Sequence, residues 1–226
     1  MIYDKALIKS NIERITKELA SRATLLAATK TVPPDIINHA ADCGIRVVGE
    51  NRVNELMEKY GQIDRERLEL HFIGHLQTNK VKYIIDKVSL IHSVDSLRLA
   101  QEIDRQAYKA GKRMDVLIEV NIANEPTKSG ILFEEIDEFV GKIRSFDNLR
   151  LRGLMSIPPK SENSYGNSVY FKKISKKFID ISHKIVDNDT IGLLSIGMSG
   201  DYMSAVENGS NLVRIGSAIF GERDRQ

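Results

Sequence analysis

The hydrophobic positions of the chain alternate between two kinds of segment. Short and nearly continuous apolar runs recur along its length, and segments in which apolar residues return every three or four positions separate them. A short apolar run is typical of a buried strand, and the longer spacing is typical of an amphipathic helix. Strand character is found in eight runs, at residues 24–30, 45–50, 68–74, 88–94, 114–122, 149–157, 191–199 and 211–220.

The segments between the runs have the signals of helices. Residues 33–44 start with two prolines, which suit a first helical turn, and finish with glycine, which suits helix termination. Residues 96–112 have apolar residues at helical spacing before a glycine, and residues 169–186 have an apolar face opposite lysines. Residues 4–20 are amphipathic and precede the first run, so we expect an extra helix there that covers one end of the fold.

This alternation predicts the fold class. Strands that alternate with helices imply parallel pairing through βαβ units, and eight such units predict a (β/α)8 (TIM) barrel. A doubly wound open sheet is the main alternative, but it usually has a glycine-rich turn after its first strand, where this chain has "ATKTVPP". No linker divides the chain, and residues 158–168 are its most loop-like segment. We therefore expect a single domain over residues 1–226 with the extra N-terminal helix.

Composition adds few constraints. The 226 residues are 42% hydrophobic, which is enough for one sizeable core, and the net charge of +2 indicates neither a nucleic-acid surface nor an acidic tail. No run approaches the ~18 apolar residues of a membrane span, and the N-terminus lacks a secretory apolar segment. The single cysteine, Cys43, excludes an intrachain disulfide. We expect a cytoplasmic monomer that binds neither nucleic acid nor membranes.

Polar residues gather where the predicted strands end, which is where the active sites of such barrels lie. The seventh and eighth strands end in "GMSGD" and "RIGS", which contain Ser199, Gly216 and Ser217. Glycine lets backbone N–H groups approach an anion, and small hydroxyls add donors, so these turns suit a phosphate group. Ordinary turns and helix caps use the same residue types. The occurrence of such residues after both the seventh and the eighth strand nevertheless favours a phosphate-binding site.

Lys30 ends the first strand, directly after an apolar run. A lysine beside apolar walls loses solvation, which favours the neutral and nucleophilic amine that forms a Schiff base with an aldehyde. A phosphate cradle at the same mouth would suit a phosphorylated aldehyde, such as pyridoxal 5′-phosphate (PLP) or a sugar phosphate. A lysine that only reaches solvent or pairs with a carboxylate is the alternative.

Seven motifs occur in a recognisable order along the chain. They are "ATK" (28–30), "GEN" (49–51), "HFIGHLQTNK" (71–80), "KSG" (128–130), "RGLMSI" (152–157), "LSIGMSGD" (194–201) and "VRIGSAIFG" (213–221). Together they resemble the PLP homeostasis protein family, which is related in fold to the N-terminal barrel of bacterial alanine racemase. The resemblance spans nearly the whole chain.

The resemblance implies a set of cofactor-binding residues. Lys30 would hold PLP as a Schiff base, and Arg214 would face the pyridine nitrogen. Ser199, Gly216 and Ser217 would hold the phosphate. The full set that it implies is Lys30, Asn51, Met155, Ser199, Arg214, Gly216 and Ser217, with Asn51 near the cofactor and Met155 packed by its ring.

Two features favour a carrier of PLP over a catalyst. A guanidinium can only donate hydrogen bonds, so Arg214 would leave the pyridine nitrogen unprotonated and weaken the cofactor as an electron sink. Racemases of the related fold also use a tyrosine from a second domain, whereas this chain ends at Gln226, soon after the eighth strand. His71 and His75, near the expected rim, make no convincing second base.

We therefore predict a PLP-binding protein that takes part in PLP homeostasis and delivery without robust turnover. Its expected partners are PLP and the apo forms of PLP-dependent enzymes. Lys128, on the same face as Lys30, would take PLP transiently during transfer. The alternatives are a PLP-dependent amino-acid racemase or lyase, a cofactor-free Schiff-base aldolase that acts on sugar phosphates, and a structural scaffold.

Overall fold

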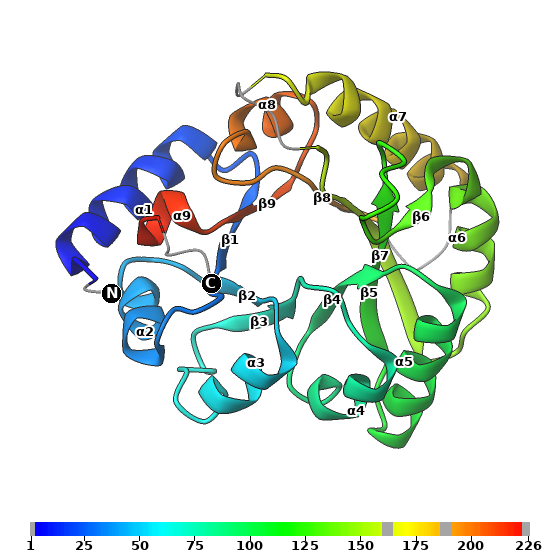
Figure 1. The fold of residues 1–226 in the computed structure, drawn as a ribbon, viewed down its shortest axis with the longest axis horizontal. Coiled ribbons are helices and arrows are strands. Elements are labelled where there is room, and N and C mark those ends of the chain that lie inside the picture. The colour runs from blue at the N-terminus through cyan, green and yellow to red at the C-terminus, as the bar shows by residue number, and fades with distance from the viewer. Residues whose placement is uncertain (1–2, 160–164, 186–190, 223–226) are drawn as a thin grey trace.

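The computed structural model describes residues 3–159, 165–185 and 191–222, and its strands form a ring that helices surround (Figure 1). The strands are parallel in the order β4-β3-β2-β1-β9-β8-β7-β5, and the pairing of β4 with β5 closes the ring. This closure confirms the predicted (β/α)8 barrel and excludes an open sheet. The barrel strands are β1 (Thr24–Ala28), β2 (Val47–Glu50), β3 (Glu69–Phe72), β4 (Leu90–Val94), β5 (Met114–Asn121), β7 (Leu149–Ser156), β8 (Leu193–Ser195) and β9 (Leu212–Ile215).

Each barrel strand lies within one of the eight predicted runs. One further strand, β6 (Ile131–Leu132), pairs with the end of β5. β6 is not among the predicted strands because two residues are too few for a periodic pattern. The helices among the described residues are α1 (Lys5–Leu19), α2 (Pro34–Asp42), α3 (Val53–Lys59), α4 (Val81–Ile84), α5 (Leu97–Lys109), α6 (Ile136–Arg144), α7 (Ser168–Lys184), α8 (Tyr202–Glu207) and α9 (Ser217–Phe220), with short 3₁₀ turns η1 (Thr78–Lys80) and η2 (Phe133–Glu135).

The expected position of the N-terminal helix is wrong. Instead of covering one end of the barrel, α1 lies along its outer wall, against α2, α8 and α9 (Figure 1). α8 and α9 are short, with six and four residues, so they leave part of the wall near β9 for another helix to cover. The buried stripe Ile8, Ile12, Ile15 and Leu19 of α1 fills that space.

Side chains alternate across the barrel wall and so form two kinds of core. The outward side chains, such as Phe72 and Ile91, join one large apolar cluster with the helices. The inward side chains form only small apolar clusters, one around Leu26 and one around Leu117. The remainder of the barrel interior is polar, and most of the buried charged and hydrogen-bonding side chains described below lie there or at its mouth.

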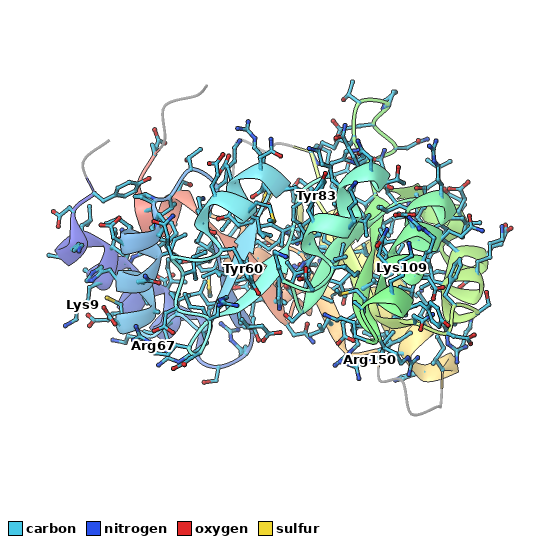
Figure 2. All side chains as sticks on the ribbon, turned by 90° about the horizontal axis from the view of Figure 1, so that it is seen from below. Lys9, Tyr60, Arg67, Tyr83, Lys109 and Arg150 are labelled. Atoms are coloured by element: carbon cyan, nitrogen blue, oxygen red, sulfur yellow. The ribbon has the colours of Figure 1, made fainter. Side chains whose placement is uncertain are left out.

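The two ends of the barrel are distinguishable in a side view. Arg67 and Arg150, just before β3 and near the start of β7, lie at the lower edge of Figure 2, which is the amino-terminal end of the strands. Over the described ranges of the chain, every helix is too short or too polar to cross a membrane. Residues 160–164 of the loop-like segment 158–168 lie outside the described residues.

Candidate functional site

The structure gathers the predicted site residues at the carboxyl end of the barrel. Because all the barrel strands are parallel, residues that follow different strands share one end. Met155 and Arg214 lie within β7 and β9, and the others lie just beyond the end of a strand. The positions are Lys30 after β1, Asn51 after β2, Met155 in β7, Ser199 after β8, Arg214 in β9, and Gly216 and Ser217 where α9 begins.

Lys30 is half-buried, and the residues on both sides of it are anchored to neighbouring elements. The backbone N–H of Thr29 donates to the carbonyl of Gly49 at 2.9 Å, and its hydroxyl donates to Glu50 at 2.7 Å. Thr31 has a positive φ of 61°, which is costly for a β-branched residue, and its N–H donates to Glu55 at 2.7 Å. The backbone that carries Lys30 is therefore held from both sides.

A buried ion pair lies behind this strand end. Lys59 Nζ donates to Glu50 Oε1 and to the carbonyl oxygen of Thr29, both at 2.9 Å, and Glu55 Oε2 lies 3.4 Å away. Glu50 is fully buried and Lys59 nearly so. Burial raises the pKa of Glu50, while Lys59 and the Thr29 hydroxyl oppose that rise. The pair joins β1, β2 and α3 beneath Lys30.

The pair between Glu50 and Lys59 is not evident from the sequence. Glu50 belongs to the "GEN" motif, but Lys59 reads as one more charged residue on a helix. The structure also explains why glycine occupies position 74, which follows β3 in the motif of residues 71–80. A Cβ at Gly74 would lie 2.1 Å from the carbonyl oxygen of Asn51, so only glycine lets these two motifs approach so closely. Asn51 itself is half-buried at the mouth.

Arg214 points into the barrel and is 4% exposed. Its Nη1 donates to the carbonyl and the hydroxyl of Ser195, both at 2.6 Å, and its Nη2 donates to the carbonyl of Ser156 at 3.1 Å. Burial lowers the pKa of Arg214 to about 10, against the opposing effects of Glu119 and Asp201. The guanidinium is therefore still a cation at neutral pH, held by uncharged acceptors.

The turns after β8 and β9 meet around one hydroxyl oxygen. The backbone N–H groups of Gly216 and Ala218 both donate to Ser199 Oγ at 3.2 Å. Two amide donors thus converge on a single oxygen position, which is the arrangement that suits a phosphate oxygen. The exposed Ser217 lies between them in the chain.

Glu119 is a titratable group at the same end of the barrel. It lies in β5, in register with Met155 of β7, and it is 7% exposed. Burial raises its pKa to about 7, with Asp95 adding to the rise and Arg214 opposing it. A carboxyl group of this kind can hold or give up a proton near neutral pH. The sequence places Glu119 near a strand end but indicates no role for it.

The two histidines expected at the rim differ. His75 is at the rim and exposed, and its Nδ1 lies 3.4 Å from Asp95 and 3.2 Å from Ser129 Oγ. His71 is inside the barrel and buried, with Nε2 3.0 Å from Glu69, so its expected rim position is wrong. The pleat of β3 turns this side chain inward, which the apolar run alone did not reveal.

Lys128 lies on the loop between β5 and β6, at the carboxyl end of the barrel. Its Nζ donates to the carbonyl of Pro158 at 2.9 Å and pairs with Glu125 at 2.7 Å. Asn121 fixes the start of this loop through hydrogen bonds with the backbone of Glu125. Within the described part of the chain, no group of three or more His, Cys, Asp or Glu side chains could hold a metal ion.

Comparisons with known proteins show the family to which the chain belongs. The alanine racemase N-terminal domain family matches residues 3–224. A pyridoxal phosphate homeostasis protein of Aquifex aeolicus is 45% identical over 94% of this chain and 95% of its own length. The protein of the same name from Escherichia coli K12 is 38% identical over 89% of this chain and 86% of its own.

A solved structure extends the likeness. PipY of Synechococcus elongatus, determined with PLP bound, matches with a TM-score of 0.85 and 27% identity, over 95% of this chain and the whole of PipY. The sequence motifs, the barrel and the relatives thus point the same way. The chain belongs to the alanine racemase N-terminal domain family and, within it, to the pyridoxal phosphate homeostasis proteins.

Proposed function

We propose that this protein binds PLP at the carboxyl end of its barrel and serves PLP homeostasis by holding and releasing the cofactor. The observation that carries the proposal is the convergence of two backbone N–H groups, which follow β9, on Ser199 Oγ. β9 pairs with β1, and Lys30 lies just after β1. A phosphate cradle and an amine at one barrel mouth fit a phosphorylated aldehyde. The names of the relatives support PLP as that aldehyde.

Each candidate residue then has a role. The amine of Lys30 condenses with the aldehyde of PLP, forming a C=N bond with the release of one water molecule. The amides of Gly216 and Ala218, with the hydroxyls of Ser199 and Ser217, hold the phosphate. Asn51 and Met155 flank the ring, and Arg214 donates toward the pyridine nitrogen.

Arg214 is the reason to propose holding over turnover. When bound, PLP can supply an electron sink for reactions at amino groups, which works best with a protonated pyridine nitrogen. A buried guanidinium that remains charged at neutral pH offers hydrogen bonds but no exchangeable proton to that nitrogen. The names of the relatives also describe homeostasis rather than an enzyme activity, and they give no support to a sugar-phosphate aldolase.

The absorbance of the purified protein tests the proposal. We expect a chromophore of bound PLP that borohydride fixes covalently, with peptide mapping that locates the label on Lys30. The Lys30→Ala variant should lose the chromophore and keep its fold by circular dichroism. A wild-type protein that neither carries nor takes up PLP, or a label on another lysine, would contradict the assignment.

A PLP-dependent amino-acid racemase or lyase remains a second candidate because of Glu119. Its carboxyl group, with a pKa of about 7, can exchange protons in the mouth of the barrel. Incubation with several L-amino acids, followed by chiral analysis, separates the two candidates. Multiple turnovers to D-isomers that are lost in Glu119→Gln would favour the enzyme, and their absence favours the carrier.

We also propose that the protein delivers PLP to apo forms of PLP-dependent enzymes, with Lys128 as a transient acceptor. Support comes from the position of Lys128 at the same end of the barrel as Lys30. In a transfer assay with an apo-enzyme, Lys128→Ala should slow delivery, whereas Lys142→Ala, on the distant helix α6, should not. Delivery by Lys128→Ala at the wild-type rate would end this idea.

The predicted monomer, the cytoplasmic location and the single domain over residues 1–226 stay predictions. Light scattering on the eluting protein would measure its mass directly, and a mass of about twice the 25.5 kDa of the chain would contradict the monomer. Fractionation of cells would test the location.

A further inference from the structure

The polar side chains inside the barrel form one continuous line of hydrogen bonds. From Arg214 the line runs to Ser195 Oγ at 2.6 Å, then to His92 Nδ1 at 3.0 Å. His92 Nε2 lies 3.0 Å from His71 Nδ1, and His71 Nε2 lies 3.0 Å from Glu69 Oε1. The line crosses β9, β8, β4 and β3, and it runs from the candidate site toward the amino-terminal end of the barrel.

All members of the line except the last are buried. His92 and Ser195 are fully buried, and His71 and Arg214 are each 4% exposed. The Glu69 side chain is 54% exposed, so this end of the line reaches solvent. Buried polar groups in a barrel interior need partners, because an unpaired one loses its hydrogen bonds to water and gains none in return. Loss of one side chain of the line would therefore leave a buried neighbour without one of its hydrogen-bond partners.

The chemistry of the two ends sets the direction of the first and last bonds of the line. Arg214 has only donors, so Ser195 Oγ must accept from it. Hydrogen bonds from His71 and Ser89 lower the pKa of Glu69 to about 2, so this carboxylate can only accept, and His71 Nε2 must carry a proton. Burial lowers the pKa of His92 well below that of free histidine, so its ring is neutral and has one N–H.

The middle of the line then has one solution in which the His71 ring carries a single proton, on Nε2. In this solution His71 Nδ1 accepts from His92 Nε2–H. His92 Nδ1 is consequently bare and accepts from the Ser195 hydroxyl. Ser195 thus turns its proton toward His92 and a lone pair toward Arg214. Every bond points the same way, from the cation to the carboxylate.

We propose that His92 is a positioning residue, which acts through Ser195 to hold the guanidinium of Arg214 in a single orientation. The effect of this positioning on PLP binding rests on the proposed function. The orientation of the hydrogen bonds along the line does not. Three of the five N–H groups of Arg214 donate to Ser195 and Ser156, and the planar fork fixes the direction of the other two. Those two are the donors left to meet the ring nitrogen.

The arrangement is tested first without cofactor, by nitrogen NMR of the histidine rings in PLP-free protein. We expect His92 to carry its proton on Nε2 and to stay neutral over the pH range in which free histidine titrates. A proton on Nδ1, or a charged ring within that range, would overturn the proposal, because Ser195 could then not present its lone pair to Arg214 in this way.

Two substitutions at one position test the consequence. In His92→Asn the side-chain oxygen replaces Nδ1 as acceptor for Ser195, whereas in His92→Leu no acceptor remains. We expect His92→Leu to speed rotation of the Arg214 guanidinium, seen by NMR in PLP-free protein, and to weaken PLP binding about tenfold. His92→Asn should retain slow rotation and bind within about threefold of wild type.

Ser195→Ala, which removes the hydroxyl directly, should behave as His92→Leu does. Equal guanidinium rotation in His92→Leu and wild type would overturn the proposal, as would equal weakening by the Asn and Leu variants. If wild-type protein fails to bind PLP, the proposed function falls, and the tautomer and rotation measurements still decide the positioning role.

Discussion

Lys30 and Arg214, the two basic residues of the candidate site, are supported at different points. Around Lys30 the protein anchors the backbone: Thr29 and Thr31 are tied to Glu50 and Glu55, with Lys59 completing a buried ion pair. At Arg214 the protein anchors the charged head itself, through Ser195 and Ser156, and the carboxylate of Glu69 is several hydrogen bonds away.

The difference matches the two proposed tasks. A lysine that forms and breaks a covalent bond needs a fixed origin, and the hydrogen bonds of Thr29 and Thr31 provide it at the strand end. An arginine that only directs hydrogen bonds works best when its head is immobile. The oppositely charged side chains of Glu50 and Lys59 therefore lie behind Lys30, whereas the acceptors that hold Arg214 are uncharged.

The largest effect is expected from breaking the ion pair behind Lys30. Glu50→Ala leaves Lys59 buried without its nearest carboxylate, which should cost about 3–5 kcal/mol of unfolding free energy. Urea denaturation measures this cost. Asp42→Ala, which breaks the exposed pair with Arg67, is the matched control and should cost at most about 1 kcal/mol. Similar losses in both variants would show that the buried pair has no special weight.

A smaller and pH-dependent effect on the free energy of unfolding is expected from Glu119, whose charge acts on Arg214. Because folding raises the pKa of Glu119 to about 7, the folded state binds the extra proton. Its contribution to stability is therefore fully present below about pH 4 and is lost as pH rises to about 7, by up to about 3 kcal/mol. Glu119→Gln should remove this slope when unfolding is measured across that range. An unchanged slope would mean that Glu119 titrates normally.

Glu69 lies at the other end of the hydrogen-bonded line, and its contribution to stability depends on pH with the opposite sign. Its pKa is lowered to about 2 by the hydrogen bond from His71, so its contribution is present above about pH 4 and is lost as pH falls toward 2. Its exposure to water makes this effect smaller than that of Glu119. Comparison of Glu69→Gln with Glu119→Gln in the same unfolding series separates the two slopes, and slopes of equal sign would contradict these assignments.

The smallest effect is expected from the strained residue beside Lys30. Thr31→Gly relieves the positive φ but frees the unfolded chain and removes the hydroxyl that donates to the carbonyl of Lys30. These terms oppose each other, so the unfolding free energy should change by less than about 1 kcal/mol. The affinity of Thr31→Gly for PLP shows more directly which feature positions Lys30. A large loss of affinity would mean that the geometry of Thr31, and not the ion pair of Glu50 and Lys59, positions it.

Much of the molecule could be predicted because the signals are local. Each barrel strand is an apolar run with its own ends, and parallel strands bring those ends together, so Lys30, Ser199 and Gly216 meet at one mouth. The placement of α1 could not be predicted in this way. Its apolar stripe indicates a helix that is buried on one face, but the surface it covers exists only because α8 and α9 are short.

The amino-acid order alone therefore determines the elements, the barrel and the residues at its mouth, because periodicity and strand ends are properties of short segments. Only the tertiary structure decides how those residues are supported. His92 and Ser195 are 103 positions apart, and Lys59 meets Glu50 across a loop and a helix. Such pairs depend on strand register and on which face of the pleat turns inward, and a shift of one residue would separate them.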